Sequence, residues 1–223
     1  MHVATCTVFA ALVAGPAGSR VVGFDDQVPG GPPQGFTCSL TGNGRAGLWA
    51  VVRDDTAPSP PLALVQKDAD TTSYRFPVCV LDEPTATDVD VSVRFKPLSG
   101  SVDQAAGLVW RFRDKDNYYL VRANALEGNV VLYKVVAGKR TDIDPKGAGL
   151  WAYGRKARVA SGVWGTLRVV VKGGIFEAFV DGQKLFAAED DTFTGPGKVG
   201  IWTKADSVTH FDDLSVVVLG DQP

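Results

Sequence analysis

Two dipeptides in residues 166–187 constrain the fold more than any other feature of the sequence. Gly173-Gly174 separates two runs rich in β-branched and aromatic residues, and Asp181-Gly182 separates the second run from a third. Both dipeptides favour the two-residue turns that join antiparallel strands. Residues 166–187 are therefore predicted to form three antiparallel strands. Strand alternation gives them one apolar face, expected to be the core face, with Leu167, Val169, Val171, Phe176, Ala178, Val180 and Leu185.

Short strand-like runs separated by turn residues recur along the whole chain. The 223 residues include 25 Gly and 13 Pro, and few segments show a helical pattern. This combination favours an all-β fold, and we expect a β-sandwich of two packed antiparallel sheets. No long Pro/Gly/Ser linker divides the chain after residue 22. Residues 22–223 are therefore predicted to form a single domain.

The first 21 residues differ from the rest. Residues 8–14 are apolar and small residues follow, as in an export signal, although the usual basic residues before the apolar run are missing. We interpret residues 1–21 as a signal-like or anchoring segment; a short buried strand or helix is the alternative. An export signal predicts a periplasmic or secreted protein. A retained segment would offer a contact for a protein partner.

Cys38 and Cys79 both lie in apolar, strand-like runs. A disulfide between them would close a loop of about 40 residues and stabilise the fold by roughly 4 kcal/mol in the chain-entropy model. Two buried thiols that act as small apolar side chains are the alternative. The spacing does not match a zinc site.

The stretch from residue 111 to 135 places polar side chains at every second position of a predicted sheet. If residues 114–117 form a turn, Arg113 pairs with Tyr118 and Arg111 pairs with Leu120. The core face then holds Trp110, Phe112, Tyr119 and Val121. The opposite face holds Val109, Arg111, Arg113, Tyr118, Arg122 and Asn124, and a second turn at residues 125–128 adds Tyr133.

This polar face has the chemistry of a saccharide site. Such a site needs planar hydrogen-bond donors, amides and an aromatic surface. Arg111, Arg122, Asn124 and Tyr133 supply them, and Lys204 could join from a neighbouring strand. A solvated sheet face with charges for solubility is the alternative.

The five tryptophans divide into two groups by context. Trp49, Trp110, Trp164 and Trp202 lie in strand-like runs and are expected in the core. Trp151 lies in residues 141–162, the longest stretch without strand alternation and the expected binding loop or lid. We therefore expect Trp151 to be an aromatic platform for the ligand.

Three segments carry a family resemblance over roughly residues 22–218. They are AGLVWRFRDKDNYYLVRANALEGNVVLYKVVAGKR, GVWGTLRVVVKGGIFEAFVDGQKLF and DDTFTGPGKVGIWTKADSVTHFDDLSV. They resemble the bacterial 3-keto-disaccharide hydrolase-like family, whose domains are concanavalin A-like lectin/glucanase jelly rolls. The resemblance implies a two-sheet jelly roll, usually exported, that binds or acts on saccharides across its concave sheet. The polar face with Arg111 and Arg122 would be that concave face.

Several acidic residues of the sequence could be catalytic. Retaining glucanases of the related jelly rolls use a Glu-x-Asp-x-x-Glu strand, and the nearest match here, residues 189–194, ends in Thr194 instead of Glu. The candidates are Glu127, Asp190 and Asp206, with Asp191 as a further acid in reach. Two carboxyl groups ~5–9 Å apart would fit glycosidic hydrolysis. The alternative for each residue is an acid that stabilises a turn.

A metal site is the weaker expectation. The sequence Phe-Asp-Asp occurs at residues 24–26 and 211–213, and paired terminal strands of a jelly roll would bring these acids together. Asp25 and Asp213 are the candidate ligands of a structural calcium ion, which prefers oxygen ligands. Acids that end strands and accept backbone hydrogen bonds are the alternative.

Three functions remain open at this stage. The first is an exported jelly-roll domain that binds a saccharide, such as a keto-disaccharide. The second is a glycoside hydrolase acting on 3-keto-glycosides, and the third is a non-catalytic structural or accessory subunit. The net charge of −2 argues against a nucleic-acid partner, because proteins that bind nucleic acids in general are usually basic.

Overall fold

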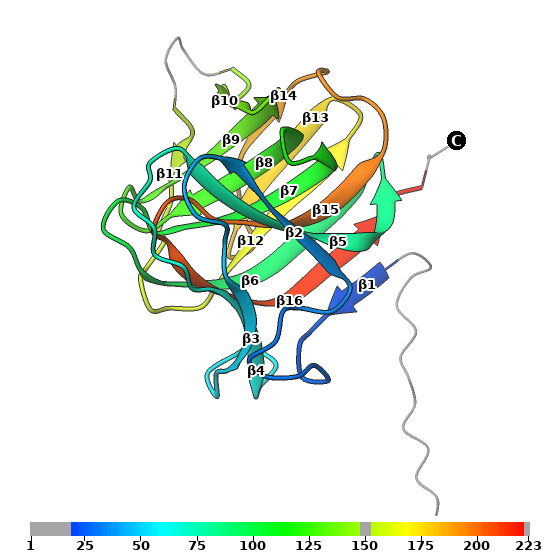
Figure 1. Ribbon diagram of the computed structural model, residues 1–223. Coiled ribbons are helices and arrows are strands. Elements are labelled where there is room, and N and C mark those ends of the chain that lie inside the picture. The colour runs from blue at the N-terminus through cyan, green and yellow to red at the C-terminus, as the bar shows by residue number, and fades with distance from the viewer. Residues whose placement is uncertain (1–18, 148–152, 221–223) are drawn as a thin grey trace, which may run out of the picture.

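The computed structural model describes residues 19–147 and 153–220, which form two antiparallel sheets packed face to face (Figure 1). The predicted all-β sandwich is confirmed. Sheet A has the order β14 (Gln183–Glu189), β13 (Ile175–Val180), β12 (Gly165–Lys172), β6 (Val89–Ser99), β16 (Val208–Val218), β4 (Leu62–Gln66) and β3 (Trp49–Arg53), with β1 (Ser19–Val22) on β16. Sheet B has the order β10 (Lys139–Ile143), β9 (Asn129–Val136), β8 (Asn117–Asn124), β7 (Ala105–Asp114), β15 (Gly197–Trp202), β5 (Arg75–Ala86) and β2 (Phe36–Gly42), with β11 (Arg155–Lys156) on β9.

The N-terminal end of the described chain lies close to the predicted boundary at residue 21. Strand β1 starts at Ser19, so the last residues of the predicted 1–21 segment already belong to sheet A. None of the described residues forms a helix that is long and apolar enough to cross a membrane.

Both hairpins predicted in residues 166–187 are confirmed. Lys172 pairs with Ile175 across the Gly173-Gly174 turn, and Val180 pairs with Gln183 across the Asp181-Gly182 turn. A register shift after Ala178 changes the face of the third strand. As a result Phe186 lies in the core, and Leu185 is only partly buried against it.

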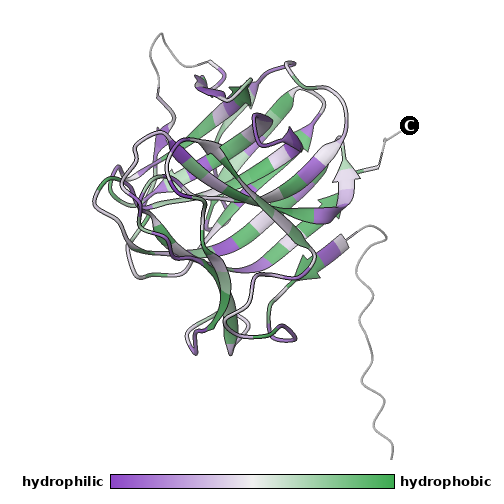
Figure 2. Ribbon diagram, in the orientation of Figure 1, coloured by the Kyte–Doolittle hydropathy of each residue, from purple (hydrophilic) through white to green (hydrophobic). Residues whose placement is uncertain are grey.

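The main core lies between the two sheets. Along most strands in Figure 2, apolar residues (green) alternate with polar or neutral ones. The inward-facing residues include Val91 and Val93 on β6, Leu167 and Val169 on β12, and Leu108, Trp110 and Val121 on sheet B. This alternation is the pattern expected when each sheet buries one face against the other.

Sheet B is also buried on its outer face, which the sequence pattern did not predict. A second apolar cluster lies there and consists of Phe76, Val78, Val80, Ala105, Val109, Phe112, Tyr118, Leu120, Val131, Tyr133, Val135 and Trp202. Part of its cover comes from Tyr74, whose ring packs edge-on against Phe76, and from Gly154, whose backbone lies against Val130 and Val131. Polar groups on this face are therefore held in a largely dry environment.

The tryptophans follow the prediction with one exception. Trp49, Trp110 and Trp202 are buried, although Trp202 belongs to the outer cluster of sheet B and not to the core between the sheets. Trp164 is half-buried and lies outside both clusters. The prediction of a core position is therefore wrong for Trp164.

A β-bulge at Arg111 corrects the predicted register of β7. Trp110 pairs with Tyr119, and Val109 lies opposite Leu120 in the place predicted for Arg111. Arg111 has a φ angle of 46°, in the left-handed region that a bulge residue adopts. A bulge reverses the alternation beyond it, so Phe112 joins the outer cluster while Arg111 turns inward.

The Arg111 side chain joins the two sheets at one end of the sandwich. It is 1% exposed, and its guanidinium donates to the carbonyl oxygens of Thr87 (2.9 Å), Phe193 (2.6 Å) and Gly173 (2.6 Å). Asp88 completes the set as its ion-pair partner at 3.3 Å. Arg111 is therefore not on the face of Arg122, and its predicted place in a ligand site is wrong.

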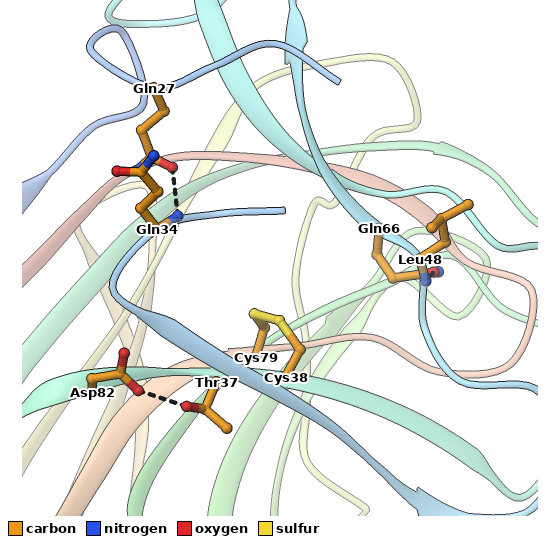
Figure 3. Close-up of a disulfide and its surroundings, with 8 residues drawn as sticks. All are labelled: Gln27, Gln34, Thr37, Cys38, Leu48, Gln66, Cys79 and Asp82. Carbon is orange, nitrogen blue, oxygen red and sulfur yellow. Dashed lines mark hydrogen bonds between the residues drawn. A yellow bond between two sulfur atoms is a disulfide. The ribbon is translucent and has the colours of Figure 1, made fainter. Parts of the chain in front are cut away.

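Cys38 and Cys79 are directly opposite each other on β2 and β5, and a disulfide joins them (Figure 3). The two cysteines are 41 residues apart in the sequence. The Thr37 hydroxyl donates to Asp82 (2.6 Å) across the same two strands, as Figure 3 also shows. The bond thus fixes the edge strand of sheet B to its neighbour.

The bulge depends on a glycine in the neighbouring strand, which gives a first prediction. A Cβ atom on Gly197 would lie 2.4 Å from the carbonyl carbon of Arg111, whereas a Cβ on Gly195 would meet nothing closer than 3.9 Å. Gly197→Ala is expected to lower the free energy of unfolding by roughly 2–4 kcal/mol, because backbone atoms must move. Gly195→Ala, the control, should change it by less than about 1 kcal/mol. Denaturant titration measures both, and equal effects would contradict this role of Gly197.

Candidate functional site

A network of polar side chains lies on the outer face of sheet B, where β8 turns into β9. Arg122 is fully buried, and its two terminal nitrogens donate to the two carboxylate oxygens of Glu127 at 3.0 and 2.9 Å. One of these nitrogens also donates to Asn129 Oδ1 at 2.6 Å. Strand alternation puts Arg122 on this face, together with Leu120 and Tyr118 of the outer cluster. Two hydrogen bonds to one carboxylate hold the Arg122 guanidinium in a single orientation.

The side-chain amide of Asn124 connects two acids. Its nitrogen donates to Glu127 Oε1 at 3.1 Å and to Asp103 Oδ1. Its oxygen accepts from the backbone nitrogens of Leu126 (2.9 Å) and Glu127 (3.3 Å), which fixes the turn between β8 and β9. The Asn124 side chain therefore holds Glu127 at two points, the Glu127 backbone nitrogen and the Glu127 carboxylate.

Asp103 and Lys204 form an ion pair next to Asn124. Asp103 is buried, and Lys204 follows β15 in the chain. Burial raises the pKa of the Asp103 carboxyl despite its ion pair with Lys204. Burial also acts to raise the pKa of Glu127, but the Arg122 guanidinium outweighs it and the net pKa is lowered. The two acids that share Asn124 thus differ in proton affinity.

Two tyrosines and a second arginine extend the network. The Tyr133 and Tyr153 hydroxyls are hydrogen-bonded to each other at 2.5 Å, and the Arg122 guanidinium lies 5.7 Å and 5.9 Å from their ring centroids. The Arg140 guanidinium lies 4.4 Å from the Tyr133 ring. Tyr153 is 47% exposed, so the network opens to solvent there and at Glu127.

The structure brings together five of the predicted site residues and separates others. Those that meet on the outer face of sheet B are Arg122, Asn124, Glu127, Tyr133 and Lys204. Trp151 lies outside the described residues, although Tyr153 from the same predicted loop reaches the network.

Asp190 lies on the opposite side of sheet B from Glu127. Its partners are Tyr119, whose hydroxyl donates at 2.6 Å, and Lys134, whose ammonium lies at 2.5 Å. Tyr119 and Lys134 occupy inward-facing positions of β8 and β9. Burial acts to raise the pKa of Asp190, but Lys134 and the hydrogen bonds outweigh it and lower it to about 2. The prediction that Asp190 joins Glu127 at one site is therefore wrong.

Asp206 supports the site from behind and does not face a ligand. It is 4% exposed, and its oxygens accept from the backbone nitrogens of Ser101 (2.6 Å), Val102 (3.1 Å) and Asp103 (3.0 Å). Burial acts to raise the pKa of Asp206, but these hydrogen bonds lower it overall. Its place is that of an acid that fixes a loop, which differs from the catalytic position predicted for it.

The two acids predicted to hold calcium lie near Asp212 of β16, and each already accepts a hydrogen bond. Asp25 Oδ1 accepts from the Leu62 nitrogen (2.9 Å), and Asp213 Oδ1 accepts from the Ser59 hydroxyl (2.8 Å). Between them, burial raises the pKa of Asp212 to about 6. Within the described ranges, no group of three or more His, Cys, Asp or Glu side chains is arranged to hold a metal ion. A structural calcium ion stays an untested prediction.

A second polar group lies on the outer face of sheet A. The Asp54 carboxylate accepts from Thr56 Oγ1 (2.6 Å), is 2.7 Å from His210 Nδ1 and forms an ion pair with Lys96. The Lys96 ammonium lies 5.0 Å from the Trp164 ring. This group offers an aromatic surface, but its only carboxylate is already engaged by three neighbours.

Sequence reasoning missed three members of the network, and two of them left a signal. Asn129 is two residues beyond Glu127, so the predicted turn would have placed it beside Arg122. Arg140 follows the Ala137-Gly138 turn, whose positive φ angles close a hairpin that pairs Arg140 with Val135. Asp103, the third, lies in a connection that carries no strand pattern, whereas Tyr153 belongs to the predicted binding loop.

Comparisons with known proteins agree with the fold. No protein-family model matches the chain, and neither does any curated protein sequence. Carbohydrate-binding module CBM66 from Bacillus subtilis is similar in structure, with a TM-score of 0.61 and 17% identity, over 82% of this chain and 95% of that chain. The cellulose induced protein Cip1 is similar at a TM-score of 0.55 and 13% identity, over 83% and 94%.

A third similar structure is a Bacillus subtilis protein of unknown function with a galectin-like fold. Its TM-score is 0.53 at 14% identity, over 81% of this chain and 88% of that chain. At these identities the likeness shows the fold alone. The chain therefore has a jelly-roll sandwich of the galectin-like kind.

The position of Asp190 gives a prediction about pH. Its folded-state pKa of about 2 lies below the ordinary value of 3.8, so its ion pair stabilises the fold above pH 4 and is lost as pH falls towards 2. Wild type should exceed Asp190→Asn in free energy of unfolding by roughly 2 kcal/mol at pH 7, with the difference shrinking between pH 4 and 2. Asp191→Asn, at the exposed neighbouring residue, is the control. A difference that stays constant across this range would contradict the ion-pair account.

Proposed function

We propose that this protein is a saccharide-binding domain whose site is the outer face of sheet B. The observation that carries the proposal is the Arg122 network, in which a guanidinium, two amides and two carboxylates are fixed beside the Tyr133 and Tyr153 rings. Sugars are bound by such a combination, because their hydroxyl groups need both donors and acceptors while their ring faces pack on aromatic side chains. CBM66, a carbohydrate-binding module by name, has the same fold, which supports the proposal.

We also propose that the protein is exported to the periplasm or secreted. The Cys38–Cys79 disulfide supports this, because disulfides persist in oxidising compartments and are rare in the cytosol.

Hydrolysis of 3-keto-glycosides is the second candidate function. It is supported by the two carboxyl groups that share the Asn124 amide, since a raised pKa at Asp103 and a lowered pKa at Glu127 suit a division into acid and base. Two features of Asp103 oppose hydrolysis. Its carboxylate is already paired with Lys204, and its side chain is only 1% exposed. The binding function is therefore the one that the geometry supports best.

A panel of neutral, acidic and keto-sugar oligosaccharides tests the proposal when both binding and turnover are scored. Tyr153→Ala and Glu127→Gln should each weaken binding by roughly tenfold or more, because they remove an exposed ring and a charged acceptor. Trp164→Ala is the matched control: it removes a half-buried aromatic ring from the outer face of sheet A, and binding should be unchanged.

The variants also separate the alternatives. Loss of binding in Trp164→Ala alone would move the site to sheet A and contradict the proposal. Turnover of a keto-sugar that Glu127→Gln abolishes would favour the hydrolase.

A further inference from the structure

Arg140 is a cation of the network that forms no ion pair with a carboxylate of the described residues. The other two cations of the network are each paired, Arg122 with Glu127 and Lys204 with Asp103. No carboxylate of the described residues lies within 4.0 Å of the Arg140 guanidinium, although it is half-buried. The network therefore carries one positive charge in excess, and that charge is on Arg140.

The two fully buried arginines outside the network, Arg75 and Arg111, each have an acidic partner. Arg75 is paired with Asp68 and Arg111 with Asp88, and carbonyl oxygens take up their remaining donors. The Arg140 side chain, in contrast, donates no hydrogen bond within the described ranges, and its Nη1 is fully covered. Leaving buried donors unpaired costs free energy, so a group of this kind is expected to have an acceptor in the working protein.

Aromatic rings hold Arg140 in place without neutralising it. Its guanidinium carbon lies 4.7 Å from the Phe76 ring, 4.4 Å from the Tyr133 ring and 5.9 Å from the Trp202 ring. Stacking on aromatic faces fixes the plane of the guanidinium and leaves its edge free to donate. Tyr133 also contacts Arg122, so Arg140 borders the proposed saccharide site.

We propose that the saccharide bound on sheet B carries a carboxylate group, as uronic acids do, and that Arg140 binds this carboxylate through two parallel hydrogen bonds. A guanidinium edge matches a carboxylate in geometry and charge. The carboxylate would supply the missing counter-charge and acceptors for the guanidinium nitrogens other than the covered Nη1. The inference rests on the proposed saccharide site and adds the class of ligand to it.

Matched pairs of oligosaccharides test this inference. Each pair has the same backbone, with C6 as a neutral alcohol in one member and as a carboxylate in the other, for glucose, galactose and mannose series. Calorimetry on the wild-type protein should show that the acidic member of at least one pair binds about 10- to 100-fold more tightly, the range expected for hydrogen bonds between charged groups.

The variants locate the preference. Arg140→Gln should abolish the preference for the acidic member, so that the two members of a pair bind with similar affinity. Arg140→Lys should restore it only in part, because lysine keeps the charge but loses the planar pair of donors. Arg53→Gln, an exposed arginine on sheet A, is the control and should behave as wild type.

The outcomes separate the inference from the proposed function. Equal affinity for both members of every pair would overturn the inference and leave the saccharide site standing. A C6-sulfated oligosaccharide that binds as tightly as the carboxylate would overturn the specific pairing with a carboxylate. Absence of binding to every member would overturn both. The comparison of acidic and neutral oligosaccharides on the wild-type protein tests the inference even if Arg140→Gln does not fold.

Discussion

The ion pair between the buried Arg122 and the partly exposed Glu127 is the interaction on which the site depends. A guanidinium with no exposed surface is tolerated only when its charge is balanced and most of its donors are paired. Here Glu127 balances the charge, and Glu127 and Asn129 accept hydrogen bonds from the two terminal nitrogens of Arg122. Because Glu127 lies in the β8–β9 connection and Asn129 begins β9, these bonds fix that turn as well as the guanidinium. Asn124 and the Tyr133 ring are then held at defined positions next to it.

The two outer faces of the sandwich differ in a way that follows from this. Sheet A presents mostly exposed and half-buried ion pairs, such as Asp90 with Arg168 and Glu177 with Lys184, as a solvated sheet does, and its buried pair is Asp54 with Lys96. Sheet B covers its outer face with a second apolar cluster and keeps its charges inside it. Polar groups in such surroundings are pre-oriented and poorly hydrated, which suits recognition of a polar ligand.

Much of the fold could be predicted because local residues determine it. The Gly173-Gly174 and Asp181-Gly182 turns fix the pairing next to each turn, and alternation then assigns the faces up to the register shift after Ala178. The face of Arg122, Asn124 and Tyr133 followed from the two turns that flank β8. The bulge at Arg111 could not be predicted in this way, because it depends on the close approach of Gly197 from a strand 86 residues further along the chain. The places of Asp103 and Lys204 depend likewise on the pairing of β7 with β15.

The most direct test of the account is an NMR titration of the isotope-labelled protein with the oligosaccharide that binds best. We expect the shift changes to be concentrated on β8, β9, β10 and the connections that carry Glu127 and Tyr153, and to include the Nε–H signals of Arg122 and Arg140. Changes confined to the strands of sheet A, or changes that leave both arginine signals untouched, would contradict a site on the outer face of sheet B.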